Sequence, residues 1–193
     1  MISTTDEAEH ANARLSARIE DLRIELAAAR ERVIELERLA DTDPLLPLPN
    51  RRAFLRGVDH AIRRTERYGT PAAVLFVDVD GLKSINDAHG HSSGDAVLLH
   101  VGRVLLANLR AADLIARIGG DEFGLVLDFL HVDAAHAKAR QLVDAIASAS
   151  LDLGRTQLRI GITAGLAMIA PGDTGEHVLA RADRAMYAQR SAR

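Results

Sequence analysis

Four acidic side chains stand where short apolar runs end, and they are the first candidates for chemistry in this sequence. Asp78 and Asp80 end the run AAVLFVDVD, which is apolar up to that point. Asp121 and Glu122 lie between the apolar runs LIARI and FGLVL, directly after two glycines. A buried carboxylate is costly unless it is paired or binds a metal ion, so the arrangement favours a cation site. Carboxylates and backbone carbonyls suit Mg²⁺, which typically completes its shell with substrate phosphates.

Asp121 and Glu122 also admit a simpler interpretation as solvated residues of a hairpin turn. Gly119 and Gly120 favour the site, because two glycines let the backbone pass close to a ligand and leave the carboxylates facing it. The pair therefore counts as a candidate site together with the end of the earlier strand.

The composition excludes several classes of protein. The 193 residues are 48% hydrophobic and 26% charged, which suits one globular domain with an appendage. Cysteine is absent, which excludes disulfides, thiolate zinc sites and a cysteine nucleophile and fits a reducing compartment. His89 and His91 stand in a glycine-rich segment and are weak zinc candidates. A net charge of −3 and 3% aromatic residues argue against a nucleic-acid binder.

The sequence also lacks the features of a membrane protein. No apolar run approaches the roughly 20 residues that span a bilayer. The first residues, MISTTDEAEH, are too polar for a signal peptide. We therefore expect a cytoplasmic protein without membrane contact, in which any nucleotide ligand is held locally.

Strand and helix patterns alternate after residue 50. We expect helices at 51–68, about 95–109, about 134–149 and 176–190, and strands at 72–80, 114–118, 123–127 and within 158–169. Residues 81–94 have the pattern of a glycine-rich loop, and the two short strands around Gly119 and Gly120 that of a hairpin. The order predicts one sheet covered by helices.

The first forty residues contain neither Gly nor Pro and predict one long helix. Its heptad positions are Asn12, Ile19, Leu26, Val33 and Ala40 in one series and Ala8, Leu15, Leu22, Ala29 and Leu36 in the other. This spacing is typical of a parallel dimeric coiled coil, in which Asn12 would set the register. Of the expected charge contacts between helices, two are favourable and one is not: Glu25 with Arg30, Arg32 with Glu37, and Arg18 with Arg23. The alternative is an amphipathic helix packed on its own domain.

Residues 41–50, DTDPLLPLPN, form what we call the joint. They carry three of the five prolines, so the long helix must end near Asp41. Asn50 is a candidate N-cap for the next helix. We therefore expect a dimerisation helix at 1–40, a stiff proline-rich turn at 41–50 and a globular domain at 51–193.

Four segments together resemble the GGDEF family of diguanylate cyclases over about residues 41–193. Gly119-Gly120-Asp121-Glu122-Phe123 is the signature of that family. FVDVDGLKSINDAHGHSSGD is similar to its pattern F-x-D-x-D-x-F-K-x-I-N-D-x-x-G-H-x-x-G-D, while DPLLPLPNRR and ADRAMYAQR resemble its first turn and closing helix. The resemblance implies an α+β fold akin to nucleotidyl cyclases and polymerase palms, with a central, mostly antiparallel sheet. It also implies an enzyme that converts two GTP into cyclic di-GMP and pyrophosphate, and the heptads at 1–40 predict that this enzyme is a homodimer.

The resemblance further implies a metal site and a substrate site in the domain at 51–193. Mg²⁺, with Mn²⁺ as the alternative, would bind the side chains of Asp78, Asp121 and Glu122 and the carbonyl of Val79. The same three carboxylates are the candidate catalytic residues. The substrate contacts would come from Asn86 and Asp95 at guanine, and from Lys83, Gly81, Leu82, His91, Gly119, Gly120 and Arg190 around the rest of GTP. A carboxylate such as Asp95 accepts from guanine N1–H and N2–H₂ together, whereas adenine has no matching donors.

Arg110 and Asp113 form the pattern R-x-x-D shortly before the signature. In the family this is an inhibitory site for the product, and a guanidinium can bind guanine O6 and N7 together. The pattern alone carries no weight, because Arg18 and Asp21 match it on the long helix. Its position in front of the signature makes Arg110 and Asp113 the candidate product site.

The chain departs from the family pattern at several positions. Leu46 and Pro47 stand where the family usually has Thr and Gly, and Arg190 stands where Lys is common. Silent GGDEF domains, which serve as receptors for GTP or cyclic di-GMP, typically lose the signature carboxylates. Because both remain here, we expect an active, product-inhibited cyclase rather than a receptor, and a user of GTP rather than ATP.

Overall fold

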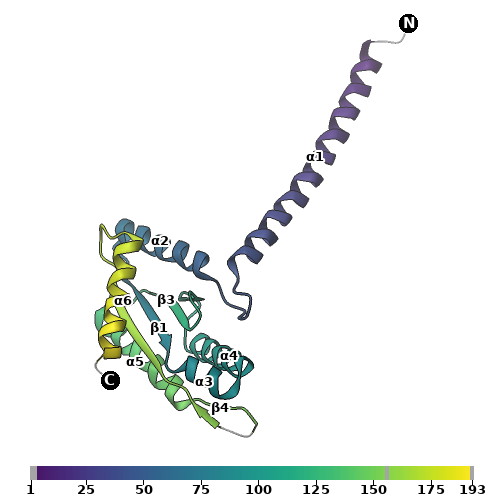
Figure 1. The fold of residues 1–193 in the computed structure, drawn as a ribbon. Helices are drawn as coiled ribbons and strands as arrows, with labels where there is room; N and C mark the ends of the chain where they lie inside the picture. Colours follow the sequence, from purple (N-terminus) through teal and green to yellow (C-terminus); the bar gives the residue numbers. More distant parts are fainter. Residues whose placement is uncertain (1–3, 155–156, 192–193) are drawn as a thin grey trace. The chain divides into compact units, whose positions relative to one another are not determined.

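The computed structural model describes residues 4–154 and 157–191, and it contains two compact units, Met1–Ala40 and Asp41–Arg193. The first unit is a single helix, α1 (Thr4–Asp41), so the predicted long helix is confirmed (Figure 1). The apolar side chains described in both heptad series are about half exposed: Leu15, Ile19, Leu22, Leu26, Val33 and Leu36. The side chain of Asn12, which we expect to set a register, lies outside the described residues. None of the described helices is long and apolar enough to cross a bilayer.

The second unit is built on a four-stranded sheet. Its strands are β1 (Ala72–Val79), β2 (Leu114–Arg117), β3 (Glu122–Asp128) and β6 (Ile162–Met168), in the order β2-β3-β1-β6. Every pairing described in this sheet is antiparallel. The central strand β1 therefore has a neighbour on each side, and its last residues meet the start of β3 and the start of β6.

Helices cover both faces of the sheet (Figure 1). Alternate residues of β1 point into two separate cores, because side chains alternate between the faces of a strand. Leu75 and Val77 pack with α4 (His91–Ala107) and α5 (Val132–Ser148), whereas Val74 and Phe76 pack with α2 (Arg51–Tyr68) and α6 (Gly175–Ser191). Asp78 is two residues after Phe76, so its side chain lies on the same face of the sheet as Val74 and Phe76, the face that α6 covers.

The expected elements are largely confirmed. Helix α2 has the predicted bounds, and the Asn50 side chain caps it by accepting from the backbone N–H of Arg52 (3.0 Å) and Ala53 (3.2 Å). The hairpin at Gly119 and Gly120 is also confirmed. A second, small hairpin, β4 (Ser150–Asp152) with β5 (Gln157–Arg159), precedes β6 and was not expected as a separate pair.

The prediction of a continuous loop at 81–94 was wrong. Residues Leu82–His89 form a helix, α3, and α4 starts at His91 rather than near Asp95. Gly81 (φ 73°) and Gly90 (φ 85°) adopt positive φ immediately before these two helices. Glycine adopts such angles without steric cost, so here it marks the starts of helices and not a long loop.

Candidate active site

Asp78 lies at the end of the central strand and is 5% exposed. In the sheet it pairs with Glu122 of β3 on one side and with Thr163 of β6 on the other. Its Oδ1 atom is buried and accepts no hydrogen bond from any described residue. A buried acceptor without a hydrogen bond is uncommon in folded proteins, which makes Asp78 Oδ1 a candidate ligand atom.

The signature turn, which we define as Gly119–Glu122, joins β2 to β3 beside Asp78. The backbone N–H groups of Ile118 and Gly119 donate to the Glu122 carbonyl, at 2.9 and 3.3 Å. The Val79 N–H donates to the Asp121 carbonyl at 3.0 Å, which ties the turn to β1. A Cβ atom at position 119 would overlap Glu122 Oε2, so a side chain there would displace this carboxylate.

The acidic groups at this end of the sheet act on one another. Burial raises the pKa of the Asp78 carboxyl, and the nearby charges of Asp121, Glu122 and Asp80 raise it further. The guanidinium of Arg190 opposes this shift. Four carboxylates with one opposing cation leave a local excess of negative charge, which a divalent cation would balance.

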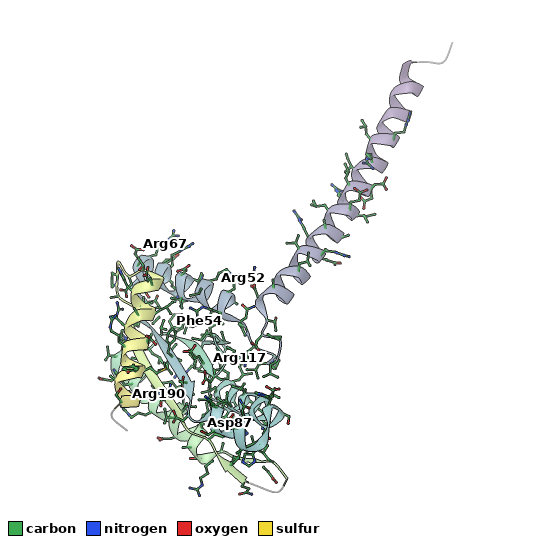
Figure 2. The ribbon with its side chains drawn as sticks, viewed as in Figure 1. Arg52, Phe54, Arg67, Asp87, Arg117 and Arg190 are labelled. Atoms are coloured by element: carbon green, nitrogen blue, oxygen red, sulfur yellow. The ribbon has the colours of Figure 1, made fainter. Side chains whose placement is uncertain are left out.

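Arg190 is the cation nearest to Asp78 among the described ion pairs. Its Nη1 atom lies 3.1 Å from Asp78 Oδ1, without the geometry of a hydrogen bond. Arg190 stands on the last turn of α6, and its side chain is 54% exposed (Figure 2). Sequence reasoning placed Arg190 in the substrate site, and the structure puts it directly at the candidate metal ligand.

Asp80 differs from Asp78, because its side chain accepts a hydrogen bond from a neighbouring strand. Its Oδ1 accepts from the Thr163 hydroxyl at 2.7 Å, and a Cβ atom at position 161 would lie 2.8 Å from its Oδ2. Asp80 therefore links the end of β1 to the start of β6. The metal-binding set implied by the resemblance omits Asp80, which is consistent with this role.

The residues implied at the base lie at the junction of α3 and α4. Asn86 Oδ1 is buried and has no hydrogen-bond partner among the described residues. A Cβ atom at position 94 would overlap this amide, so Gly94 lets Asn86 lie against the first turn of α4. Asp95 is exposed on that same turn. A free acceptor beside an exposed carboxylate suits the adjacent N–H donors of guanine.

The residues implied at the phosphates cluster around the start of α3. Gly81 precedes the helix, Lys83 is exposed on its first turn, and Leu82 is 8% exposed with its side chain in the core. Leu82 can therefore offer only its backbone to a ligand. A helix N-terminus with a nearby ammonium suits a phosphate. His91 is exposed at the start of α4.

The residues fit a metal that is shared with a substrate better than one enclosed by protein. Within residues 4–154 and 157–191, no three His, Asp or Glu side chains converge as a complete metal cage. Mg²⁺ commonly uses one or two carboxylates and takes its other ligands from phosphates and water. Asp78 Oδ1, which accepts no hydrogen bond from the described residues and whose one described ion-pair partner is the half-exposed Arg190, is consistent with that mode of binding.

The R-x-x-D pair lies at the opposite end of β3. Asp113 Oδ2 accepts the backbone N–H of Arg110 at 2.9 Å, and its Oδ1 accepts the N–H of Asp128 at 3.1 Å. Asp113 thus shapes the turn, while the Arg110 side chain is exposed. Arg64 of α2 forms an ion pair with Asp128 in the same region.

Sequence reasoning missed Arg117, the last residue of β2. Its guanidinium donates to Asp43 of the joint and to the Gly120 carbonyl of the signature turn. The only available signal was an arginine just before the two glycines, and nothing in the sequence connects it to Asp43.

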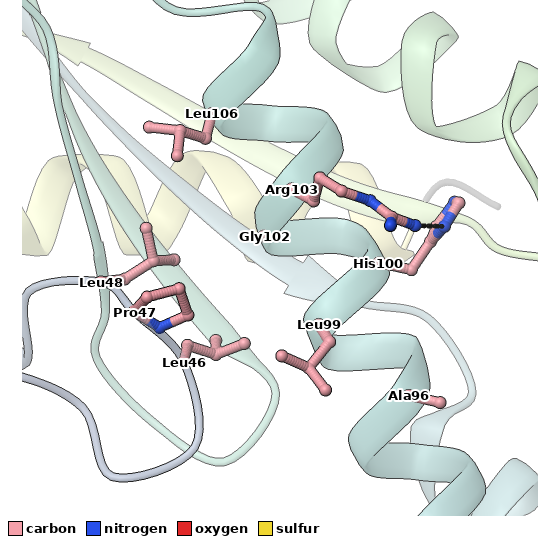
Figure 3. Close-up of a pocket in the computed structure, with 9 residues that line it drawn as sticks. All are labelled: Leu46, Pro47, Leu48, Ala96, Leu99, His100, Gly102, Arg103 and Leu106. Atoms are coloured by element: carbon pink, nitrogen blue, oxygen red, sulfur yellow. Dashed lines mark hydrogen bonds between the residues drawn. The ribbon is translucent and has the colours of Figure 1, made fainter.

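A separate apolar pocket of about 500 Å³ lies between the joint and α4 (Figure 3). Its lining includes Leu46, Pro47 and Leu48 from the joint and Leu99 and Leu106 from α4. None of the residues implied at the metal or at GTP lines it. It marks the packing of the joint on the domain rather than the carboxylate site.

Comparison with known proteins matches most of the chain. A family model described as "Diguanylate cyclase, GGDEF domain" matches residues 40–193. The bifunctional diguanylate cyclase/cyclic di-GMP phosphodiesterase MucR of Pseudomonas aeruginosa is 40% identical over 178 residues, covering 91% of this chain and 25% of that protein. Diguanylate cyclase DgcP of the same species is 34% identical over 188 residues, covering 94% and 28%. The chain thus spans about a quarter of the length of these relatives.

Solved structures show the same fold. The coiled coil and GGDEF domain of DgcB from Caulobacter crescentus, in complex with c-di-GMP, matches with a TM-score of 0.82 and 30% identity, covering 92% of this chain and 95% of that chain. Diguanylate cyclase SiaD of Pseudomonas aeruginosa, in complex with its activator SiaC, matches with a TM-score of 0.76 and 30% identity, covering 97% and 76%. These matches confirm the predicted palm-like domain with a central antiparallel sheet.

Proposed function

The chain belongs to the GGDEF family of diguanylate cyclases, and we propose that it joins two GTP molecules into cyclic di-GMP. In each half of the reaction, a ribose 3′-hydroxyl attacks the α-phosphorus of the other GTP. The new P–O bond forms as the bond to pyrophosphate breaks. The observation that carries this proposal is the buried Oδ1 of Asp78, which accepts no hydrogen bond from the described residues, on a residue paired in the sheet with Glu122 of an intact signature turn.

Asp78, Asp121 and Glu122, with the Val79 carbonyl, would hold Mg²⁺, or Mn²⁺ in its place. The metal would lower the pKa of the attacking hydroxyl and offset the charge on the phosphates. The protein's role would be to hold these carboxylates close together at the partly buried end of the sheet. Two contacts support this arrangement: Asp78 pairs with Glu122 across β1 and β3, and the Val79 N–H donates to the Asp121 carbonyl.

Selection of GTP would rest on Asn86 and Asp95. Asn86 Oδ1 accepts no hydrogen bond in the described chain, and the exposed Asp95, which directly follows the Gly94 that Asn86 lies against, supplies further acceptors. Lys83, the backbone at Gly81 and Leu82, His91, the glycines of the signature turn and Arg190 would contact the rest of the nucleotide. When GTP binds, the Arg190 guanidinium would leave its ion pair with Asp78 and bind a phosphate oxygen instead, because its half-exposed side chain has room to move.

Product inhibition would act through Arg110 and Asp113. Asp113 is committed to two backbone N–H groups, so it would set the shape of the turn, and the exposed guanidinium of Arg110 would bind the guanine edge. The complex of DgcB with c-di-GMP is consistent with product binding by a related domain.

A homodimer would form through α1. Each domain would hold one GTP, so two domains must face each other before either 3′-hydroxyl can attack. The exposed heptad side chains of α1 would bury each other in a parallel coil and make that encounter intramolecular. Deletion of residues 1–40 should therefore yield a monomer whose activity per chain rises with protein concentration.

Incubation with GTP and Mg²⁺, followed by chromatography of the products, tests the reaction directly. Cyclic di-GMP and pyrophosphate should appear in a ratio of one to two, and ATP offered alone should give no cyclic product. Binding of GTP without turnover, under conditions where a known cyclase is active, would instead favour a silent receptor.

A further inference from the structure

The joint is a closed loop held by its own backbone and by α4. Asp43 N–H donates to the Leu48 carbonyl at 2.8 Å, and Asn50 N–H donates to the Asp41 carbonyl at 2.7 Å. Leu46 and Leu48 are buried and pack beside Gly102 of α4, where a Cβ atom would lie 3.3 Å from Leu48 Cδ1 and 3.7 Å from Leu46 Cδ2. The joint therefore has a defined shape on the domain.

Asp43 is the polar centre of the joint. Its Oδ1 atom accepts the backbone N–H groups of Leu45 and Leu46, at 2.9 and 2.8 Å. The same atom accepts from Arg117 Nη1 at 3.1 Å. A charged acceptor strengthens each of these bonds, so Asp43 holds the joint and Arg117 together.

Arg117 connects this loop to the signature turn. Its Nη2 atom donates to the Gly120 carbonyl at 2.8 Å, and its backbone N–H donates to the Pro49 carbonyl at 2.9 Å. The Arg117 side chain is 14% exposed, and Figure 2 labels it between the joint and the sheet. A guanidinium is planar, so two partners on two of its nitrogens are held in a fixed relation to each other.

The signature turn depends on contacts from outside it, such as those of Arg117, because two of its four residues are glycines. Gly119 and Gly120 have no side chains with which to anchor it, and glycine has the greatest backbone freedom of all residues. The described backbone bonds reach the turn at Gly119, Asp121 and Glu122, whereas Arg117 alone among the described side chains holds Gly120. A shift of the Gly120 backbone would also displace Asp121 and Glu122, the two carboxylates that follow it in the chain.

We propose that Arg117 is a positioning residue that couples the joint to the carboxylates of the signature turn. It touches neither the metal site nor GTP; it acts by fixing Gly120, and Asp43 fixes Arg117 in turn. The inference rests on the proposed cyclase function for its effect on rate. A displacement of about 1 Å at reacting groups can cost about 100-fold in rate, so a loss of this size is within reach of a positioning residue.

The test compares Arg117→Ala with Arg117→Lys, Asp43→Asn and a matched control, Arg64→Ala. Asp43→Asn keeps an oxygen for the two N–H groups of the joint and removes the charge that holds Arg117. Lysine carries one charged group and so can hold one of the two partners of Arg117 at a time. Arg64 forms a comparable ion pair with Asp128 at the far end of β3, with side chains 21% and 9% exposed against 14% and 11% for Arg117 and Asp43.

We expect Arg117→Ala to lower kcat at least tenfold and to change KM for GTP less than threefold. Arg117→Lys should recover part of kcat. Asp43→Asn should lower kcat less than Arg117→Ala, and the double variant should be no slower than Arg117→Ala alone, because both act through one contact. Arg64→Ala should lose a similar amount of stability and keep its initial rate within twofold, measured with a phosphodiesterase removing product.

A second measurement does not depend on turnover. Binding of Mn²⁺ alone, followed by its electron paramagnetic resonance signal, should weaken at least fivefold in Arg117→Ala and stay within twofold in Arg64→Ala. Equal kcat and equal Mn²⁺ affinity in these two variants would overturn the inference, as would an effect on KM alone. A parent protein that binds Mn²⁺ but makes no cyclic di-GMP would refute the proposed function, and the Mn²⁺ comparison would still decide the inference.

Discussion

The two ends of β3 both carry acidic side chains, and the chain satisfies them differently. At the Asp128 end, Arg64 pairs with Asp128, and Asp113 accepts the N–H groups of Arg110 and Asp128. At the Glu122 end, Asp78 Oδ1 accepts no hydrogen bond from the described residues, and Arg190 is an exposed partner on the last turn of α6. The acidic groups at the Asp128 end thus accept hydrogen bonds from the chain, although Arg64 Nε there has no described partner, whereas Asp78 Oδ1 at the Glu122 end accepts none.

The difference between the two ends distinguishes acidic residues that support the fold, such as Asp128, from those that we propose as ligands of a metal ion, such as Asp78. Burial raises the pKa of both the Asp78 and the Asp128 carboxyl. The next largest influence on Asp128 is Arg64, which lowers its pKa, whereas for Asp78 it is Asp121, which raises it. Because nearly all buried polar groups in folded proteins have partners, we propose the Glu122 end, where an acceptor is left without a hydrogen bond, as the place for a cation and its substrate.

The largest expected effect on the rate comes from removing a carboxylate at the Glu122 end of β3. Glu122→Gln should lower kcat about 1,000-fold or more, because loss of a group at the transition-state charge typically costs several kcal/mol. Asp128→Asn is the matched change at the other end and should keep kcat within about threefold. Product formation by Glu122→Gln at a rate near that of Asp128→Asn would break the distinction between the two ends.

The second largest effect is on product inhibition and concerns Arg110, the exposed arginine at the Asp128 end of β3. Arg110→Ala should raise the concentration of cyclic di-GMP that halves the rate by about 5–150-fold, since a bidentate guanine contact contributes about 1–3 kcal/mol. Initial rates at increasing added product measure this. If added product inhibits the variant as strongly as the parent, the product binds elsewhere.

The third effect is on stability and leaves the chemistry alone. Arg64→Ala leaves the buried Asp128 carboxylate without its cation, which should cost about 1–3 kcal/mol because the pair is only partly buried. Urea unfolding of parent and variant measures the loss. An unchanged unfolding midpoint would show that the ion pair at this end does not support the fold.

The smallest effect depends on pH and concerns Asp78. Its folded pKa is raised, so the folded protein loses stability as pH rises through the unfolded pKa and then the folded one, and the loss is complete above both. Asp78→Asn removes this penalty and gives up an ion pair with a half-exposed arginine, which contributes little. With EDTA present, the variant should melt higher than the parent at pH 7, by about 2–4 °C for each kcal/mol gained.

The same comparison should shrink as the pH is lowered toward about 4, because the folded Asp78 carboxyl is then protonated and the unfolded one begins to be protonated as well. Melting curves at several pH values between 7 and 4.5 show the trend. A variant that melts below the parent at pH 7 without metal would mean that Arg190 stabilises Asp78 more than burial destabilises it.

The sequence by itself determined the local elements and the identity of the site. Helix α2 with its Asn50 cap, the hairpin at Gly119 and Gly120, and the long helix α1 depend on short-range patterns of apolar residues, caps and glycines, which are visible along the chain. The four motif segments marked the family because their spacing follows that of its pattern. The helix at 82–89 was missed because its flanking glycines have the same letters in a loop and at the start of a helix.

Only the tertiary structure decided which acidic groups have partners. Asp113 looked like a ligand residue and proved to hold two backbone N–H groups, while Asp80 proved to be bonded to Thr163. Arg117 and Asp43 are 74 residues apart, and no local pattern predicts their contact. Such pairs form when the sheet and its helices pack, because packing brings distant side chains together and removes the water that would otherwise satisfy each of them.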